Sequence, residues 1–535
     1  MSFYTIIYSI VYEKRADAQT QLNFPQYANL RSDRAAQTTS MRPDFPRLGT
    51  DLSFRSGVAA WQARCLKICA AAGGLGLLSA PIPTLALLAG VLFLLFSALI
   101  FWRGFLIFIG LCLRVGQRPL ARKDDDASSV PVYSILVPLY QEAEIVPQLA
   151  RALTALNWPQ ERLDIQILLE ADDAQTIAAA GQAAFPQNTR LQRVSAGGPR
   201  TKPNALNFGL SEAFGTYITV YDAEDIPNPD QLKAAHQAFQ TASDDLVCVQ
   251  APLISDPTQS WIGTQWALEY AIQFGLILPS LALYRMPILI GGTSNHFRKD
   301  ALQALGGWDS WNVTEDADLG MRIARAGLAC GTISPPTLED APGQLSVWLA
   351  QRSRWLKGFI QTWLVLMRTP RKTGKQMGVV PFLSMQLSLG GAILAPLCHL
   401  PCVLVLLIGV LSPQLSVGVF GAGLLFSALL IGLISDLAAP GGLTWMRAAA
   451  ILTRPLYWPL HSIAAYRAIW ELAKAPFFWA KTPHKARDRK ETATCSTGLS
   501  ASASPPASLR WVFSRSLKWE PSAKRISAPI SFLGD

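Results

Sequence analysis

Tyr217-Ile218-Thr219-Val220-Tyr221-Asp222-Ala223-Glu224-Asp225 is the stretch that decides the fold. Its first five residues are aromatic or β-branched, which predicts a buried strand, and three carboxylates follow directly. Two earlier apolar runs have the same form. Residues 132–139 are followed by Tyr140-Gln141-Glu142, and residues 164–169 are followed by Glu170-Ala171-Asp172-Asp173. The pattern predicts short buried strands whose carboxyl ends carry acids.

Helical patterns alternate with these strands. The predicted helices cover residues 146–156, 204–214 and 229–240, and a further strand is predicted at residues 246–249. Strand and helix in turn indicate an α/β domain with a mostly parallel sheet and helices on both faces. Ligands of such sheets bind outside the carboxyl ends of the strands. We therefore expect the acids to meet at the ligand-binding edge.

The chain outside this domain is unusually apolar. No Asp, Glu, Lys or Arg occurs at residues 68–102 or 376–435, and roughly 20 apolar residues suffice for one transmembrane helix. We predict two short helices in a block at residues 64–113, broken at Pro81 and Pro83. A second block at residues 377–435 has two or more helices, broken near Ser412-Pro413. A pair of buried core helices would rarely lack charge over such lengths.

The net charge of +10 gathers beside the apolar blocks and does not indicate nucleic-acid binding. Basic residues follow the first block and precede the second: Arg114, Arg118, Arg122 and Lys123, then Arg368, Arg371, Lys372 and Lys375. The positive-inside rule makes the intervening domain, residues 127–370, cytoplasmic. The prediction is a multi-pass protein of the inner (plasma) membrane.

Three further segments complete the chain. Residues 1–62 are of mixed polarity, and no fold is assigned to them. Residues 443–473 predict an amphipathic helix at the membrane interface, with a further span as the alternative, and a loop continues to residue 485. Residues 486–535 are rich in Ser, Ala and Pro and predict a disordered tail.

A fourth acidic group, Thr314-Glu315-Asp316, precedes a predicted helix at residues 317–326, which Thr314 could cap. Each acidic cluster alone is more typical of a polar turn or a helix cap. Together at one sheet edge, the carboxylates would repel one another unless a cation or a proton lies among them. Oxygen ligands of this kind hold the hard divalent cations that bridge phosphates. The pattern indicates a metal–diphosphate site with a separate base.

Gln351-Arg352-Ser353-Arg354-Trp355 lies shortly before the second apolar block. Arg can bind phosphate through two hydrogen bonds, and Trp offers a broad apolar face for a sugar ring. The alternative is a basic, aromatic anchor at the membrane interface. We also expect Gly291-Gly292-Thr293-Ser294-Asn295-His296 to lie near an acceptor, with a tight turn as the alternative.

These motifs, in this order, resemble the membrane-bound family 2 glycosyltransferases, which include cellulose, chitin and hyaluronan synthases. The resemblance implies a Rossmann-like nucleotide-diphospho-sugar transferase domain of GT-A type flanked by transmembrane helices. It implies that Asp316 is the general base. It implies nucleotide-sugar binding by Glu142, Asp172, Asp173, Lys202 and Asp222, cation binding by Asp222, Glu224 and Asp225, and acceptor or diphosphate binding by Gln351, Arg354 and Trp355.

The sequence departs from the family pattern at Glu224, which stands where the family has the second Asp of Asp-x-Asp. Residues 477–484 resemble, more weakly, a loop that closes over the nucleotide.

The implied function is inverting transfer of a sugar from a nucleotide diphosphate sugar to a glycan acceptor, with Mg²⁺ or Mn²⁺ as cofactor. The resemblance also implies that the protein lies in membrane lipid and can synthesise polysaccharide processively. One alternative is a polyprenyl-phosphate glycosyltransferase with a lipid-linked acceptor, although such enzymes usually lack Gln-x-x-Arg-Trp. The other alternative is a non-enzymatic membrane scaffold with a degenerate transferase domain. Its only support is the departure from the family pattern at Glu224.

Overall fold

The computed structural model describes residues 48–116, 130–194, 201–256, 260–411 and 419–478. The expectations for residues 1–47, for the basic residues at 118–123, for residues 479–484 and for the tail at 486–535 lie outside these ranges. All the described residues belong to one compact unit.

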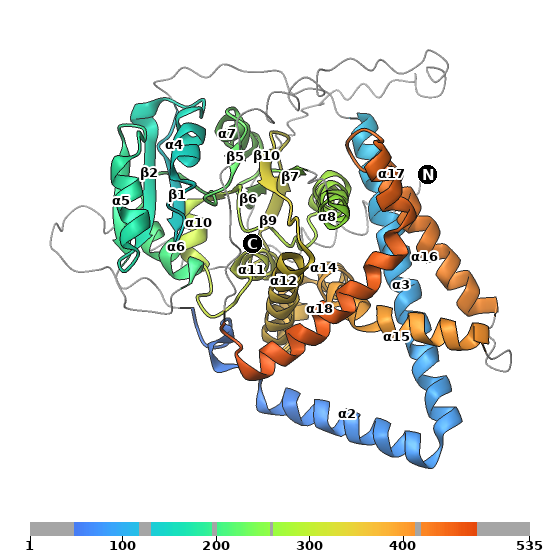
Figure 1. The fold of residues 1–535 in the computed structure, drawn as a ribbon. Coiled ribbons are helices and arrows are strands. Elements are labelled where there is room, and N and C mark those ends of the chain that lie inside the picture. The colour runs from blue at the N-terminus through green and yellow to red at the C-terminus, as the bar shows by residue number, and fades with distance from the viewer. Residues whose placement is uncertain (1–47, 117–129, 195–200, 257–259, 412–418, 479–535) are drawn as a thin grey trace, which may run out of the picture. The chain divides into compact units, whose positions relative to one another are not determined.

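The elements follow the predicted alternation in the middle of the chain (Figure 1). The strands are β1 (Tyr133–Leu139), β2 (Leu163–Glu170), β3 (Thr189–Val194), β4 (Tyr217–Val220), β5 (Ile226–Pro227), β6 (Leu246–Gln250), β7 (Leu253–Asp256), β8 (Asn295–Arg298), β9 (Ala329–Thr332) and β10 (Thr337–Asp340). The helices among and after them are α4 (Val146–Thr154), α5 (Ala174–Gln182), α6 (Lys202–Ser211), α7 (Gln231–Thr241), α8 (Trp261–Ile272), α9 (Leu278–Leu283), α10 (Lys299–Ala304), α11 (Glu315–Arg325), α12 (Leu345–Leu366) and α13 (Pro370–Met377).

The remaining helices are mostly apolar. They are α2 (Ala60–Ser79), α3 (Pro81–Gly116), α14 (Val379–Met385), α15 (Gly391–Leu411), α16 (Val419–Ala438), α17 (Trp445–Leu452) and α18 (Arg454–Lys474). Short 3₁₀ turns occur at η1 (Phe54–Ser56) and η2 (Gln160–Arg162), and π-helical turns at η3 (Gln273–Ile277) and η4 (Gln386–Gly390).

The main sheet has seven strands in the order β3-β2-β1-β4-β8-β6-β9. All neighbouring strands are parallel except β8, which runs antiparallel to β4 and β6. The sheet is therefore mostly parallel, as predicted. The tight turn that was the alternative for residues 291–296 does not extend over the whole segment, because Asn295 and His296 already pair as part of β8. A second sheet joins β5, β10 and β7.

Side chains of β1 alternate between two cores, so helices cover both faces of the sheet. Ile135 and Val137 pack with the apolar faces of α4 and α7. Leu136, which points the other way, packs with Leu206 and Leu210 of α6. Because β1 pairs in parallel with both β2 and β4, the three strands end at the same edge. Their acidic extensions are thereby brought together.

The first apolar block forms two helices that meet at Ala80, close to the predicted break. The second of them is not short, because α3 has 36 residues. In the second block, α15 ends at Leu411 and α16 starts at Val419, on either side of the predicted break. Residues 443–473, predicted as a single helix, form two helices, α17 and α18.

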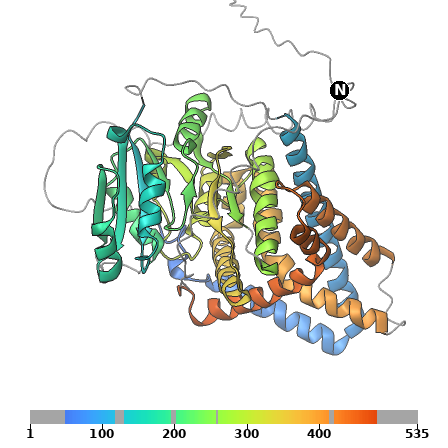
Figure 2. The same cartoon turned by 45° about the horizontal axis from the view of Figure 1, so that its top comes forward.

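Four stretches of the described residues are long and apolar enough to cross a membrane: Pro81–Arg114, Trp261–Leu283, Val379–Val403 and Gly421–Ala438. The stretch Trp261–Leu283, formed by α8, η3 and α9, was not expected. Of its 18-residue apolar window 44% is buried inside the protein, whereas none of the corresponding window of Pro81–Arg114 is buried. Figure 2 shows α3, α15 and α16 grouped on one side of the sheet domain.

Candidate functional site

The turn after β4 is held by its own acids. The Asp222 N–H donates to Asp225 Oδ2 at 2.7 Å, and the Thr293 hydroxyl donates to the same oxygen. The Lys202 ammonium donates to the carboxylate of Asp222 and, at 2.8 Å, to the carbonyl of Gly292. Lys202 is the first residue of α6, so the predicted basic residue does lie beside the predicted metal and nucleotide ligands.

Four carboxylates share this corner of the domain. Burial, and then repulsion from Asp222, raises the pKa of Asp225 to about 7. Burial and both aspartates also raise the pKa of Glu224 well above its usual range. Glu339, at the end of β10, behaves in the same way, with its pKa raised by burial, Asp225 and Asp222. Glu339 was not predicted as a site residue, although it is a further acid near a strand end.

The donor set fits a divalent cation. Asp225 Oδ1 is buried and has no hydrogen-bond partner among the described residues, and a cation would satisfy it. The Lys202 ammonium is a positive charge beside Asp222, where a cation could also bind. Burial lowers the pKa of Lys202, but the Asp222 carboxylate raises it more, so the pKa lies above its usual value. No three His, Cys, Asp or Glu side chains of the described ranges are grouped closely enough to form a ready-made metal site. Binding would therefore require these carboxylates to converge.

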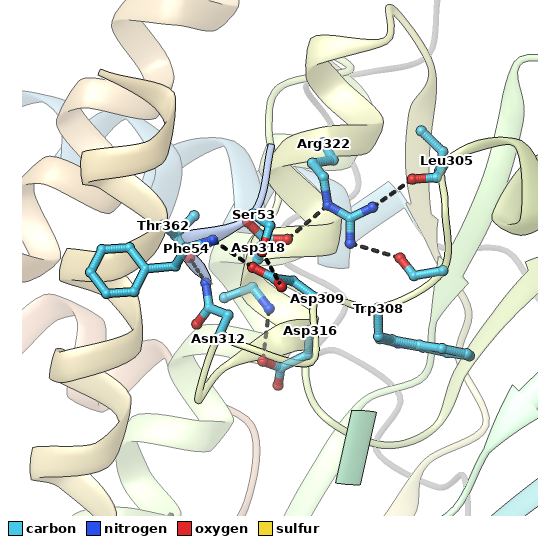
Figure 3. Close-up of polar contacts among 12 residues, drawn as sticks. Ser53, Phe54, Leu305, Trp308, Asp309, Asn312, Asp316, Asp318, Arg322 and Thr362 are labelled. Carbon is cyan, nitrogen blue, oxygen red and sulfur yellow. Dashed lines mark hydrogen bonds and ion pairs between the residues drawn. The ribbon is translucent and has the colours of Figure 1, made fainter. Parts of the chain in front are cut away.

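Asp316 is the second residue of α11 and follows a loop that is tightly bonded (Figure 3). Its Oδ1 accepts the Ala317 N–H at 2.7 Å. Burial raises the pKa of Asp316, against the opposing effects of that N–H, Lys202 and Arg354. The expectation that Thr314 caps the helix with its side chain is wrong, because its hydroxyl instead faces Asn312 Oδ1 at 3.4 Å.

Two buried contacts fix the position of α11 (Figure 3). Arg322 pairs with Asp318 at 2.7 Å and donates to the carbonyls of Leu305 and Gly307, both at 2.8 Å. The loop before α11 is also held from the N-terminal segment. There, the Ser53 hydroxyl and the Phe54 N–H donate to the carboxylate of Asp309 at 2.8 and 2.9 Å. Part of the unassigned segment 1–62 thus docks on this loop.

The aromatic motif lies on α12. Trp355 stacks against Trp266 and Tyr270, with ring centroids 4.9 and 6.3 Å apart. Arg352, which the sequence analysis quoted but gave no role, lies 4.9 Å from the Trp355 ring centre and pairs with Glu269 of α8. Arg352 therefore helps to hold the Trp355 ring in place.

One cavity of about 2060 Å³ connects these groups. Most of the predicted site residues line it: Glu142, Lys202, Asp222, Glu224, Asp316, Gln351, Arg354 and Trp355. Asp172, Asp173 and Asp225 are not in its wall. Asp173 instead caps α5 by accepting the Thr176 N–H at 3.2 Å. Glu170, Glu315 and Glu339 line the cavity without having been assigned a role.

The start of the predicted closing loop is anchored on α12. Lys357 donates to the Phe478 carbonyl at 2.7 Å, and Gln361 donates to the Pro476 carbonyl at 2.9 Å. Phe477 lies edge-on to Trp311, with ring centroids 5.0 Å apart. The described end of this segment therefore lies next to the loop that precedes Asp316.

The site combines acids at the strand ends of an α/β domain, a buried Asp at the start of a helix and an Arg-Trp motif. Together these features are typical of transferases that use sugar nucleotides. Residues 217–466 match the family model described as Glycosyl transferase family group 2. The chain is 25% identical over 275 residues to a beta-monoglucosyldiacylglycerol synthase of Synechocystis sp., covering 49% of this chain and 56% of that protein. It is also 25% identical over 248 residues to a cellulose synthase catalytic subunit of Komagataeibacter sucrofermentans, covering 45% of this chain and 32% of that protein.

Residues 217–466 of the chain are thus similar to family 2 glycosyltransferases. The matched regions span about half or less of the length of these two relatives. Among solved structures, a mannosyltransferase from Pyrobaculum calidifontis in complex with GDP-Man and Mn²⁺ is 19% identical, with a TM-score of 0.45. That alignment covers 71% of this chain and 98% of the mannosyltransferase.

Proposed function

We propose that the protein is a membrane-bound glycosyltransferase that moves a sugar from a nucleotide diphosphate sugar to an acceptor hydroxyl, with inversion at the anomeric carbon. The observation that carries the proposal is the convergence of Asp316, Lys202 and Asp222 around Gly292. A Cβ at Gly292 would lie 3.1 Å from Asp316 Oδ2 and 3.4 Å from Lys202 Nζ. The proposed base, Asp316, and the proposed phosphate-binding side chain, Lys202, thus face the same small space.

Asp316 acts as the general base in this proposal. Its raised pKa brings it closer to the working pH, which favours proton transfer from an acceptor hydroxyl. The proton moves to Asp316 as the acceptor oxygen attacks the anomeric carbon and the bond to the diphosphate breaks. One displacement of this kind inverts the anomeric centre without an enzyme-bound intermediate.

The departing diphosphate needs positive charge. Lys202 and Arg354 line the cavity together with Asp316 and supply this charge through charge-assisted hydrogen bonds. Asp222, Glu224 and Asp225 would hold a divalent cation, which when bound neutralises diphosphate charge. Glu142 and Glu170 line the cavity at the ends of β1 and β2, where the nucleoside would bind.

Trp355 offers its face to the acceptor. Its ring is fixed by Trp266, Tyr270 and Arg352, so it can receive a flat apolar sugar or head-group surface without losing much side-chain entropy. Single transfer and processive synthesis differ in whether each product becomes the next acceptor. The length of the product made by purified protein separates the two.

The test is Asp316→Asn. We expect kcat to fall by about 10²- to 10⁴-fold, because the proton acceptor is removed, while nucleotide affinity stays close to that of the parent. The measurement is nucleotide release from a panel of nucleotide sugars by detergent-solubilised protein, together with nucleotide binding by calorimetry. Asp300→Asn is the matched control, since Asp300 is an exposed acid at the same position of α10. Normal turnover of Asp316→Asn would refute the assignment of the base.

A further inference from the structure

The cavity that contains the candidate catalytic residues does not end at them. It continues between the apolar helices, where its wall is formed by residues of α3, α15 and α16, among them Phe93, Phe96, Leu99, Gly391, Ala395 and Ala428. Leu85 and Leu425 also line it and are 57% and 36% exposed, so this arm reaches the outer surface of the helices. We call it the apolar arm.

The two ends of the cavity differ in chemistry. Carboxylates, Lys202 and Arg354 surround the end near β4, and Glu269, Asp436 and Arg454 also line the cavity. The charges of these last three residues are paired, because Arg454 lies 3.3 Å from Asp436 and Glu269 contacts Arg352. A ligand that fits the whole cavity has a polar head and a long apolar tail.

A glycan strand fits the apolar arm poorly. Each sugar presents several hydroxyls, and a hydroxyl that leaves water without a hydrogen-bond partner costs roughly 1–3 kcal/mol. Ser388 of η4 and His399 of α15 are polar members of this wall, and both already contact other groups: Ser388 accepts from Trp102 at 3.1 Å, and His399 lies 3.3 Å from the Trp458 carbonyl. Hydrocarbon makes no such demand and gains from leaving water.

The base selects among lipid heads. A lipid phosphate is already ionised near pH 7 and has no proton for Asp316, which lines the cavity, to accept. A neutral hydroxyl loses its proton only in the reaction, which is the step that Asp316 serves. The proposed base therefore favours an uncharged head with a free hydroxyl.

We propose that the acceptor is a membrane lipid with a free head-group hydroxyl, whose hydrocarbon tails occupy the apolar arm between α3, α15 and α16. The inference rests on the proposed function and adds the acceptor class to it. The lipid enters sideways from the bilayer past Leu85 and Leu425. Its hydroxyl oxygen bonds to the anomeric carbon, its proton goes to Asp316, and the nucleoside diphosphate leaves.

The experiment uses the full chain in phosphatidylcholine nanodiscs, with a labelled nucleotide sugar that the protein turns over. Three arms contain diacylglycerol, a polyprenyl phosphate or a soluble oligosaccharide, and the product is counted in organic extract and in water. We expect label on diacylglycerol. Ala428→Phe, which narrows the apolar arm, should lower that product at least about tenfold, or about 1.4 kcal/mol, while the Kd of the nucleotide stays close to that of the parent.

Ala422→Phe is the matched control, because Ala422 lies on the same helix, is exposed and is not part of the cavity wall. It should behave like the parent. Label on polyprenyl phosphate or on the oligosaccharide instead of diacylglycerol would overturn the lipid inference and leave the proposed function standing. An Ala428→Phe protein that makes lipid product at the parental rate would also overturn it. Absence of nucleotide release with every donor would overturn the proposed function itself.

Discussion

Gly292 shows at the scale of one residue how little space separates the candidate base from the candidate phosphate-binding lysine. Its carbonyl accepts from Lys202 at 2.8 Å, and a Cβ would meet Asp316 Oδ2 at 3.1 Å. That contact is tight enough to move the carboxylate by a few tenths of an ångström. A small displacement of a reacting group is expensive in catalysis, although it costs little in stability.

We therefore predict that Gly292→Ala lowers kcat by roughly 10-fold or more, with only a small change in melting temperature. Steady-state nucleotide release and a thermal-shift measurement check the two parts. Gly181→Ala is the control, because Gly181 lies in α5 with open space around it. It should retain full activity and be slightly more stable, since alanine favours a helix by roughly 0.5–1 kcal/mol over glycine. Equal activity of the two variants would contradict the prediction.

Sequence patterns predicted the site residues unevenly, for a physical reason. Lys202, Asp222 and Asp316 stand at the ends or starts of regular elements, so the direction of a strand or helix brings them together. Glu339 and Arg352 reach the same region from β10 and from the middle of α12. Their position depends on how distant elements pack. The capping role of Asp173 also depends on three-dimensional context, because Gln141 contacts the same carboxylate.

At the scale of elements, α11 determines where Asp316 lies. Its Arg322–Asp318 pair is almost completely buried, with exposed fractions of 4% and 3%, and Arg322 also ties the helix to the loop at Leu305 and Gly307. Burial raises the pKa of Asp318 to about 6, even with Arg322 beside it. Loss of the arginine would leave that carboxyl buried without its cation.

Arg322→Ala should therefore destabilise the protein by about 3–5 kcal/mol at neutral pH. The measurement is the shift of the thermal or denaturant unfolding midpoint in detergent. The double variant Asp318→Ala with Arg322→Ala should recover part of the loss, because no unpaired charge remains. Arg151→Ala, at an exposed position of α4, is the control and should change the midpoint little. The prediction fails if the single variant melts with the parent.

Elements were predictable where their apolar pattern is local. The strands around residues 132–139 and 164–169 alternate between two cores, and the pattern needs no knowledge of the rest of the chain. Strand β8 was missed because Gly291 and Gly292 precede it and because its hydrogen bonds come from β4 and β6, far away in sequence. The stretch Trp261–Leu283 was missed because its apolar side chains serve the protein core as much as a bilayer.

At the scale of the whole molecule, the path of the chain limits how it can cross a membrane. The chain leaves the α/β domain near Gly57, since Ser53 and Phe54 are bonded to Asp309, and it is back in the domain by Tyr133. Between these points lie α2 and α3, of which α3 is the more apolar. If α3 crosses the bilayer, α2 must cross as well, because both ends of the pair meet the same domain, even though α2 is not one of the four stretches that are apolar enough to cross.

The same reasoning indicates that the stretch Trp261–Leu283 does not cross the bilayer. It starts just after β7, and Leu278 and Leu281 at its other end pack with Leu136 of the central sheet. Both ends thus belong to the α/β domain, and 44% of the 18-residue apolar window of the stretch is buried within the protein. We expect it to lie along the domain without spanning the bilayer.

These constraints predict that Ala80, between α2 and α3, faces the side of the membrane opposite the α/β domain. The test is Ala80→Cys in a background in which the eight native cysteines are replaced, treated with a membrane-impermeant maleimide in intact cells. Ala80→Cys should be labelled without permeabilisation, because the chain reverses there outside the bilayer. Ser243→Cys, in an exposed loop of the α/β domain, should be labelled only after permeabilisation. Labelling of both positions under the same condition would mean that α3 does not cross the bilayer. The exposed apolar surface of α3 would then need another explanation.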